Sequence, residues 1–150
     1  MATGIVVSGR FFWNIDRHVG PNRANLAEDV QLVQLGYACM GENTKFPQPP
    51  EAKAILSKIV PGDRYSGDPN DPLSQAIRMH EKRHGGTQDG IVSPIHGSSG
   101  GYGPGIGFLM NSLNNNIFDV IGEKYPFLDA HPKCPPALKD AVTRLFRTHS

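Results

Sequence analysis

The sequence predicts a mainly α-helical fold with a minor β component. Apolar residues recur at helical spacing over residues 26–40, 72–84 and 106–121, the pattern of helices that bury one face. The 17 glycines and 13 prolines among 150 residues exceed the usual share of roughly 12%, so we expect structured loops between short helices. Because domains commonly span roughly 100–150 residues, residues 1–150 are expected to form a single domain.

The N-terminal segment is expected to be extended and the next one helical. Residues 5–15, IVVSGRFFWNI, mix β-branched and aromatic residues around a glycine, as in two short extended segments or a hairpin. Asn25 stands at an N-cap position with Glu28 three residues later. These residues predict a helix over residues 26–40 that ends at Gly41. Its apolar stripe is Leu26, Val30, Val33 and Tyr37.

Two further helices are expected on either side of a turn-rich stretch. Pro50 can begin a short helix over residues 51–59, and residues 61–71, PGDRYSGDPND, are dense in turn-forming residues. Asp71 and Pro72 then supply an N-cap and a favoured first helical residue. The apolar sides of the two helices are expected at Ala54, Ile55, Leu56 and Ile59, and at Leu73, Ala76, Ile77, His80 and His84.

The second half of the chain predicts a tight turn, a glycine loop and two more helices. Gly85-Gly86 ends the preceding helix, Asp89-Gly90 forms a turn before Ile91-Val92, and residues 97–107 form a glycine-rich loop. An amphipathic helix comes next, and a last helix follows Lys133–Pro136. Their apolar residues are Ile106, Leu109, Met110, Leu113, Ile117, Val120 and Ile121, then Leu138, Ala141, Val142, Leu145 and Phe146.

Composition and charge exclude several classes of function. The formal net charge of +1 gives no strong global attraction to nucleic acid or anionic membranes, and no apolar run approaches the roughly 20 residues of a membrane span. Residues 1–10 have neither the basic region nor the apolar core of a Sec signal. We therefore expect the protein to be cytoplasmic as made and to reach the periplasm, cell wall or a particle only by a non-Sec route. Cys39 and Cys134 leave open one long-range disulfide or two buried thiols.

Two segments carry helix and turn motifs that occur together in one family. They are Val19-Gly20, Asn25 and DVQLVQ at 29–34, then LSQAIRMHEKRHG at 73–85 followed by QDGIVSP at 88–94. This combination resembles the peptidoglycan-binding-domain-like family, small modules in which a DVxxVQ helix precedes an AIxxFQ helix and a DGxVxP turn. The resemblance implies a three-helix core over residues 19–121, with residues 108–121 as its third helix.

The chain departs from the family pattern in three places. Residues 41–71 form an insertion longer than the usual connection, and residues 131–150 extend beyond the minimal module as a C-terminal extension. His80 stands where the family has Phe, so we expect it to be buried and to hydrogen-bond to one partner. The resemblance implies the scaffold more directly than it implies retained sugar or peptide binding. The glycine-rich loop at 97–107 is either a connector, which we favour, or part of a ligand-facing rim, for which the candidate residues are Arg78, His96 and Tyr102.

Residues 80–84, HEKRH, also match the H-E-x-x-H pattern of zinc hydrolases. Histidines four residues apart on a helix share a face and can bind one Zn²⁺, with Glu81 as general base on a bound water. The adjacent cations Lys82 and Arg83 oppose a metal ion there, which favours a packed histidine over a metal ligand. A third ligand would have to come from His96, His131, Asp119 or Glu123.

We therefore expect a non-catalytic binding module for cell-wall glycan or peptide, within a lysis or injection apparatus, with no cofactor. Its partner would be peptidoglycan or another protein subunit rather than nucleic acid. Two alternatives remain open. One is a structural or interaction subunit of a phage or contractile injection particle, in which the chain can oligomerise. The other is a hydrolase with zinc on His80 and His84 and with Glu81 as the catalytic residue.

Overall fold

The computed structural model describes residues 1–7, 9–96 and 108–147, and its elements confirm a mainly α-helical fold with a minor β component. In chain order these elements are β1 (Thr3–Val7), β2 (Arg10–Asn14), α1 (Ala27–Glu42), α2 (Pro50–Leu56), α3 (Pro72–Arg83), α4 (Phe108–Ile121) and α5 (Pro136–Val142). Short 3₁₀ turns at Gly122–Lys124 and Leu128–Ala130 precede α5, and a π-helical turn over Thr143–Arg147 follows it. The expected glycine loop at 97–107 lies outside the described residues.

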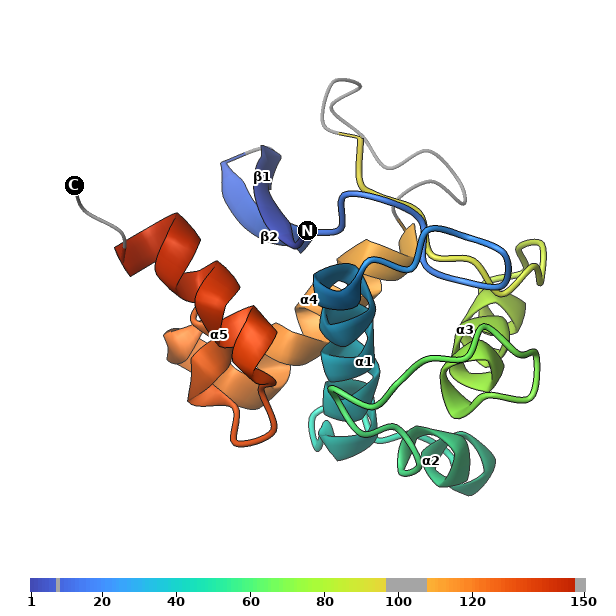
Figure 1. Cartoon of the computed structure of the whole chain (residues 1–150). Coiled ribbons are helices and arrows are strands. Elements are labelled where there is room, and N and C mark those ends of the chain that lie inside the picture. Colours follow the sequence, from blue (N-terminus) through green and yellow to red (C-terminus); the bar gives the residue numbers. More distant parts are fainter. Residues whose placement is uncertain (8, 97–107, 148–150) are drawn as a thin grey trace.

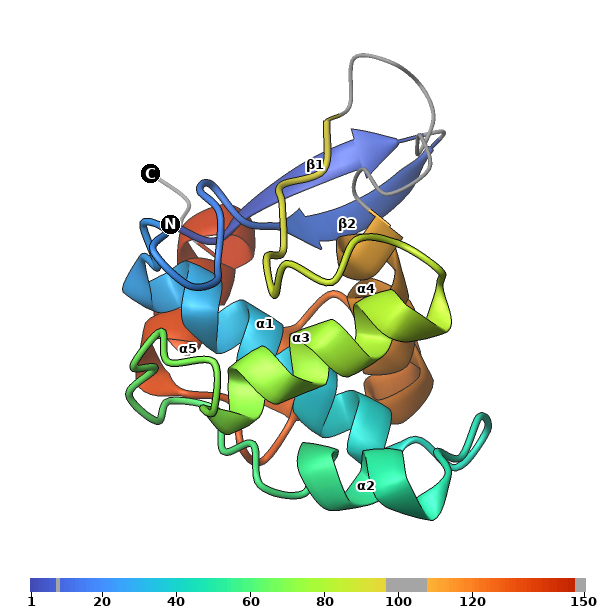
Figure 2. The ribbon, with the colours of Figure 1, turned by 90° about the vertical axis from the view of Figure 1, so that its right-hand side faces the viewer.

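Helix α1 lies at the centre of the molecule. In Figure 1, α5 lies on one side of α1, α2 and α3 lie on the other, and α4 passes behind it. Figure 2 shows α3 running across α1, with α2 below. Every residue from Leu32 to Met40 is buried, so the helix is enclosed on all sides. The sequence predicted burial along a single stripe, but residues off that stripe are buried as well. Leu35 and Cys39, which lie off it, are both 0% exposed.

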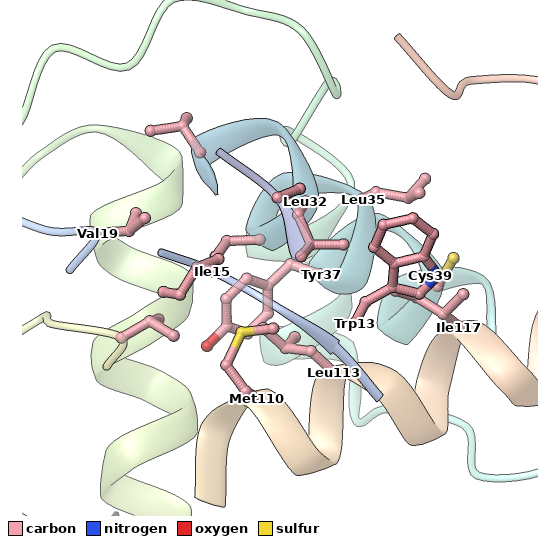
Figure 3. Close-up of a cluster of buried hydrophobic side chains, with 14 of the residues drawn as sticks. Trp13, Ile15, Val19, Leu32, Leu35, Tyr37, Cys39, Met110, Leu113 and Ile117 are labelled. Carbon is pink, nitrogen blue, oxygen red and sulfur yellow. The ribbon is translucent and has the colours of Figure 1, made fainter. Parts of the chain in front are cut away.

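Helices α1 and α4 pack closely at a glycine. A Cβ atom at Gly36 would lie 2.8 Å from the Cβ of Leu113, well inside the separation at which two carbon atoms attract each other. The bare backbone at Gly36 thus lets the two helices approach. Leu113 and Ile117 of α4 reach the same buried cluster as Leu32 and Tyr37 of α1 (Figure 3).

The N-terminal hairpin is confirmed and is fixed to α4 by one amide side chain. β1 and β2 pair antiparallel, with Thr3 opposite Asn14. On the other edge of β2, the Asn114 amide accepts a hydrogen bond from the Trp13 N–H and donates one to the Trp13 carbonyl, both at 2.8 Å. Because Trp13 is 0% exposed, its backbone groups need partners inside the protein. Asn114 supplies both partners, as a neighbouring strand would.

Of the two N-cap residues predicted from the sequence, one is confirmed and one is wrong. The Asp71 N-cap is confirmed, since its Oδ1 accepts from the Leu73 N–H at 2.9 Å. The Asn25 N-cap is wrong, because α1 begins two residues later and no side chain caps it. The Asn25 amide instead bonds to the N–H and the carbonyl of Gly20, each at 2.8 Å. Its hydrogen-bonding capacity is used to close the loop before the helix.

Further positions differ from the sequence prediction. The helix expected over residues 51–59 ends at Leu56, and Leu145, expected on an apolar helix side, is 39% exposed in the π-helical turn after α5. Leu26 precedes α1 and is 38% exposed. Gly41 does not end α1, which continues to Glu42. Ala54 is exposed because α2 buries a narrower side than expected. His84 is exposed because it is the residue after the last turn of α3, where the helix has passed the edge of the core.

The Asp89-Gly90 turn folds back against the segment that precedes α1. Val19 and Val92 exchange two backbone hydrogen bonds, with N–O distances of 3.0 and 2.8 Å. A Cβ atom at Gly20 would lie 2.5 Å from the Gly90 carbonyl oxygen. Only glycine therefore fits at position 20, and the two segments that carry the family resemblance lie in direct contact.

The two cysteines are buried free thiols. The disulfide alternative is therefore wrong, and the alternative of two buried thiols is confirmed. Burial raises the pKa of the Cys39 thiol to about 12 and, with the nearby Asp129 carboxylate, the pKa of Cys134 to about 11. Neither thiol is a thiolate at neutral pH, so each acts as a small apolar side chain in the core.

Truncation of the central core is expected to destabilise the fold. Val33→Ala and Ile77→Ala each remove buried methyl groups at residues that are 0% exposed and should lower the free energy of unfolding by about 1–4 kcal/mol. Leu26→Ala, at the exposed member of the expected stripe, should cost less than about 0.5 kcal/mol. Urea denaturation of the three variants measures these changes in the free energy of unfolding. An equal decrease at all three positions would contradict the assignment of the core.

Candidate functional site

A pocket of about 430 Å³ with a mixed polar and apolar lining opens where α1, α3 and α4 meet. One wall is the last turn of α3, a second is α4, and a third is the segment 43–48 that follows α1. The pocket is lined by Met40, Phe46, Gln48, His80, Arg83, His84, Ser112, Asn115, Asn116 and Asp119. Its volume lies in the range of sites for small molecules, and its polar groups converge from three separate elements.

His80 lies at the base of the pocket and joins three helices. Its side chain is only 2% exposed. Nδ1 lies 2.8 Å from the Tyr37 hydroxyl of α1, and Nε2 lies 3.0 Å from the Ser112 hydroxyl of α4. Burial and the neighbouring His84 and Arg83 lower the pKa of His80 to about 3, so the ring is neutral at physiological pH. The expected burial of His80 is confirmed, with two hydrogen-bond partners instead of one.

Glu81 faces away from this pocket and holds the Asp89-Gly90 turn. Its Oε1 accepts from the Gly90 N–H at 2.8 Å. Burial, with a further contribution from a hydrogen bond to the Asp89 carboxylate, raises the pKa of Glu81 to about 7. The glutamate of the HEKRH motif therefore stabilises a turn, and it is not directed at the space between the two histidines.

The described residues do not fit a catalytic zinc site. His80 and His84 are close, with ring centroids 5.2 Å apart, but both ring nitrogens of His80 already have hydroxyl partners. Asp119 lines the same pocket, where its Oδ2 accepts from the Asn43 amide at 3.0 Å. Within residues 1–7, 9–96 and 108–147, no three His, Cys, Asp or Glu side chains are grouped closely enough to hold a metal ion.

The other candidate residues lie apart from one another. His131 is buried and its Nε2 lies 2.9 Å from Glu42, while Glu123 is exposed in the turn after α4. Of the expected rim, Arg78 lies beside Gly90 rather than in the pocket. His96 is exposed at the end of a described range. Tyr102 lies outside the described residues.

Sequence reasoning missed most of the residues that form the pocket. Asn115 and Asn116 belong to an Asn114–Asn116 run within α4, and asparagine is a poor helix former because its side chain competes for backbone hydrogen bonds. Three consecutive asparagines in a helix therefore indicate that these residues are there for their side-chain contacts and not for helix stability. Asn43 and Phe46 carry no comparable local signal, since Asn43 acts through its bonds to α4 and Phe46 through its place on the pocket wall.

The segment 43–48 is held on the pocket at both ends. The Asn43 amide donates to Asn116 Oδ1 at 2.9 Å and to Asp119 Oδ2 at 3.0 Å, while its own oxygen accepts from the N–H groups of Lys45 and Phe46. At the other end, the Gln48 amide oxygen accepts a hydrogen bond from Arg83 of α3. Phe46 lies between these two anchors.

Comparison of the chain with family models, with curated proteins and with solved structures finds no match. The resemblance of the two helical segments and the Asp-Gly turn to peptidoglycan-binding-domain-like modules therefore stays a prediction. In the described part of the chain, the helices lack the combination of length and apolar character that crossing a membrane requires.

The His80–Tyr37 pair should behave as a coupled unit in unfolding. His80→Phe leaves the hydroxyl of Tyr37, a residue that is 0% exposed, without its partner, and should cost about 1–3 kcal/mol. The double variant Tyr37→Phe/His80→Phe removes both polar groups and should recover most of that loss. A double-mutant cycle from thermal or urea unfolding measures the coupling. Additive effects of the two single changes would show that the hydrogen bond contributes little.

Glu81 should make the protein less stable as pH rises. Its folded pKa of about 7 exceeds the ordinary value of 4.5, so the folded state binds more protons between these values and the free energy of unfolding falls across that window. Glu81→Gln keeps an acceptor for Gly90 and should remove this dependence, gaining on the order of 2–3 kcal/mol at pH 8. The matched control is Glu123→Gln at an exposed glutamate. If Glu81→Gln keeps the parent's dependence of the free energy of unfolding on pH, then Glu81 is not the cause of that dependence.

Proposed function

We propose that the protein is a non-catalytic module that binds bacterial cell-wall peptidoglycan through the pocket between α1, α3 and α4. The observation that carries the proposal is the convergence of Arg83, Asn115, Asn116 and Asp119 on one pocket of about 430 Å³. Amide, guanidinium and carboxylate groups can bond to the hydroxyl and amide groups that cover cell-wall polymers. The helix and turn motifs that resemble peptidoglycan-binding modules point to the same class of ligand.

The chemistry of the pocket favours binding over catalysis. Ser112 and His80 are hydrogen-bonded as a nucleophile and a base would be. However, the partner of His80 on its other side is the Tyr37 hydroxyl rather than a carboxylate. A pKa of about 3 for His80 makes it a weak proton acceptor, far from the matched pKa of a general base at neutral pH. Glu81, the other candidate base, is bound to the turn at Gly90.

Co-sedimentation with purified peptidoglycan sacculi tests this proposal. The parent protein should sediment with sacculi at low salt. Arg83→Ala removes a charged donor from the pocket and should weaken the apparent affinity about tenfold, the effect of losing a hydrogen bond to a charged group. Lys82→Ala is the matched control, because Lys82 is an exposed cation on the adjacent position of α3 but does not line the pocket.

Two outcomes would count against the proposal. No sedimentation of the folded parent at low salt would remove the binding role and favour the alternative of an assembly subunit. Equal weakening by Lys82→Ala and Arg83→Ala would show a general charge effect rather than recognition in the pocket. Melting temperatures of both variants establish that each is folded in the assay.

A further inference from the structure

Phe46 is an exposed aromatic ring on the wall of a pocket that it shares with polar side chains. It lines the pocket and is 67% exposed, although a phenylalanine usually contributes most when it is buried. The chain around Phe46 is held by its neighbours: the Asn43 Oδ1 accepts from the Phe46 N–H at 3.1 Å, and Gln48 is bonded to Arg83 across the pocket. These bonds anchor the backbone on both sides of Phe46, so the wall that presents the ring is ordered before a ligand binds.

Polar groups that can bond to the edge of such a ligand come from α4. Asn115, Asn116 and Asp119 line the same pocket as Phe46. Asn116 and Asp119 are themselves held by the Asn43 amide, at 2.9 and 3.0 Å. Asn43 is 4% exposed, and it therefore orients both the aromatic wall and the polar wall.

The charges of the pocket match a neutral ligand. Its lining contains one guanidinium, Arg83, and one carboxylate, Asp119. Burial and the charge of Arg83 lower the pKa of His84, so this histidine adds no charge at neutral pH. Within the lining, a ligand with several carboxylates would meet Asp119 and a single guanidinium, since the second guanidinium nearby, that of Arg10, bonds to Asn115 at 2.8 Å. An N-acetylated sugar has no charge to neutralise.

We propose, building on the function proposed above, that this pocket binds an N-acetylated sugar ring of the glycan strand rather than the stem peptide. The sugar stacks its apolar face on Phe46 and directs its hydroxyl and acetamido groups to α4. Asn43 is the positioning residue: it holds Phe46, Asn116 and Asp119 in place without contacting the ligand.

Titration calorimetry with two defined probes tests this inference. The probes are an N-acetylglucosamine tetrasaccharide, which has no peptide, and the free stem tetrapeptide, which has no sugar. The parent should bind the tetrasaccharide and not the tetrapeptide. Phe46→Leu keeps apolar volume but removes the ring, and should weaken tetrasaccharide binding roughly tenfold, whereas Phe46→Trp should retain or improve it. Phe127→Ala, at another exposed phenylalanine that does not line the pocket, should leave the affinity for the tetrasaccharide unchanged.

Asn43→Ala separates positioning from direct contact. It should weaken tetrasaccharide binding and also speed hydrogen exchange at the Lys45 and Phe46 amides, which lose their acceptor. The exchange readout needs no ligand. If binding weakens while the Lys45 and Phe46 amides exchange as slowly as in the parent, Asn43 contacts the sugar directly. That result would contradict the positioning role.

The outcomes distinguish this inference from the function on which it rests. If the parent binds sacculi and the tetrapeptide but not the tetrasaccharide, the sugar site is wrong while the cell-wall role stands. The same holds if Phe46→Leu binds the tetrasaccharide as tightly as the parent. If the parent binds neither sacculi nor either probe, the proposed function fails, and the inference fails with it.

Discussion

The enclosure of α1 on every side determines how the rest of the chain is arranged. A polar group buried without a partner costs several kcal/mol on apolar transfer scales, roughly 2–7. Three polar side chains of this helix therefore bond to other segments, whereas the buried Gln31 Oε1 has no hydrogen-bond partner among the described residues. Asp29 accepts from the backbone N–H groups of residues 16–17. Gln34 bonds to the backbone of residues 62–63, and Tyr37 bonds to α3. The irregular segments are therefore ordered by the polar side chains of the central helix.

The candidate site arises where this enclosure ends. Beyond Met40 the last turn of α1 leaves the core, and Asn43, the residue after the helix, uses its amide to join segment 43–48 to α4. The gap between this segment, α3 and α4 is filled only in part, by His80 at its base. The pocket is thus a consequence of the way α1 terminates, and its floor is the same Tyr37–His80–Ser112 chain that ties the three helices together.

Local sequence signals predicted the elements well and the site poorly. Asp71 followed by proline was correct because an N-cap needs only its own helix. Asn25 failed because a nearby backbone, that of Gly20, competed for the same side chain. Asn43, which holds the segment on the pocket, depends on α4, about 70 residues away in the chain, and no periodicity within one element encodes such a contact. The burial of His80 was predictable from the stripe it continues, whereas its second hydroxyl partner was not.

The HEKRH motif shows how one short helix can carry two unrelated roles. Its spacing correctly predicts that His80 and His84 lie on the same side at the end of α3, since the two rings meet at the pocket. The role of Glu81, which lies between them in the sequence, is set on the other side of the helix. There its carboxylate accepts a hydrogen bond from the Gly90 N–H. One side of α3 thus faces the pocket and the other stabilises the Asp-Gly turn. A metallohydrolase needs all three side chains on one reaction centre, and in α3 the two histidines and Glu81 instead face different neighbours.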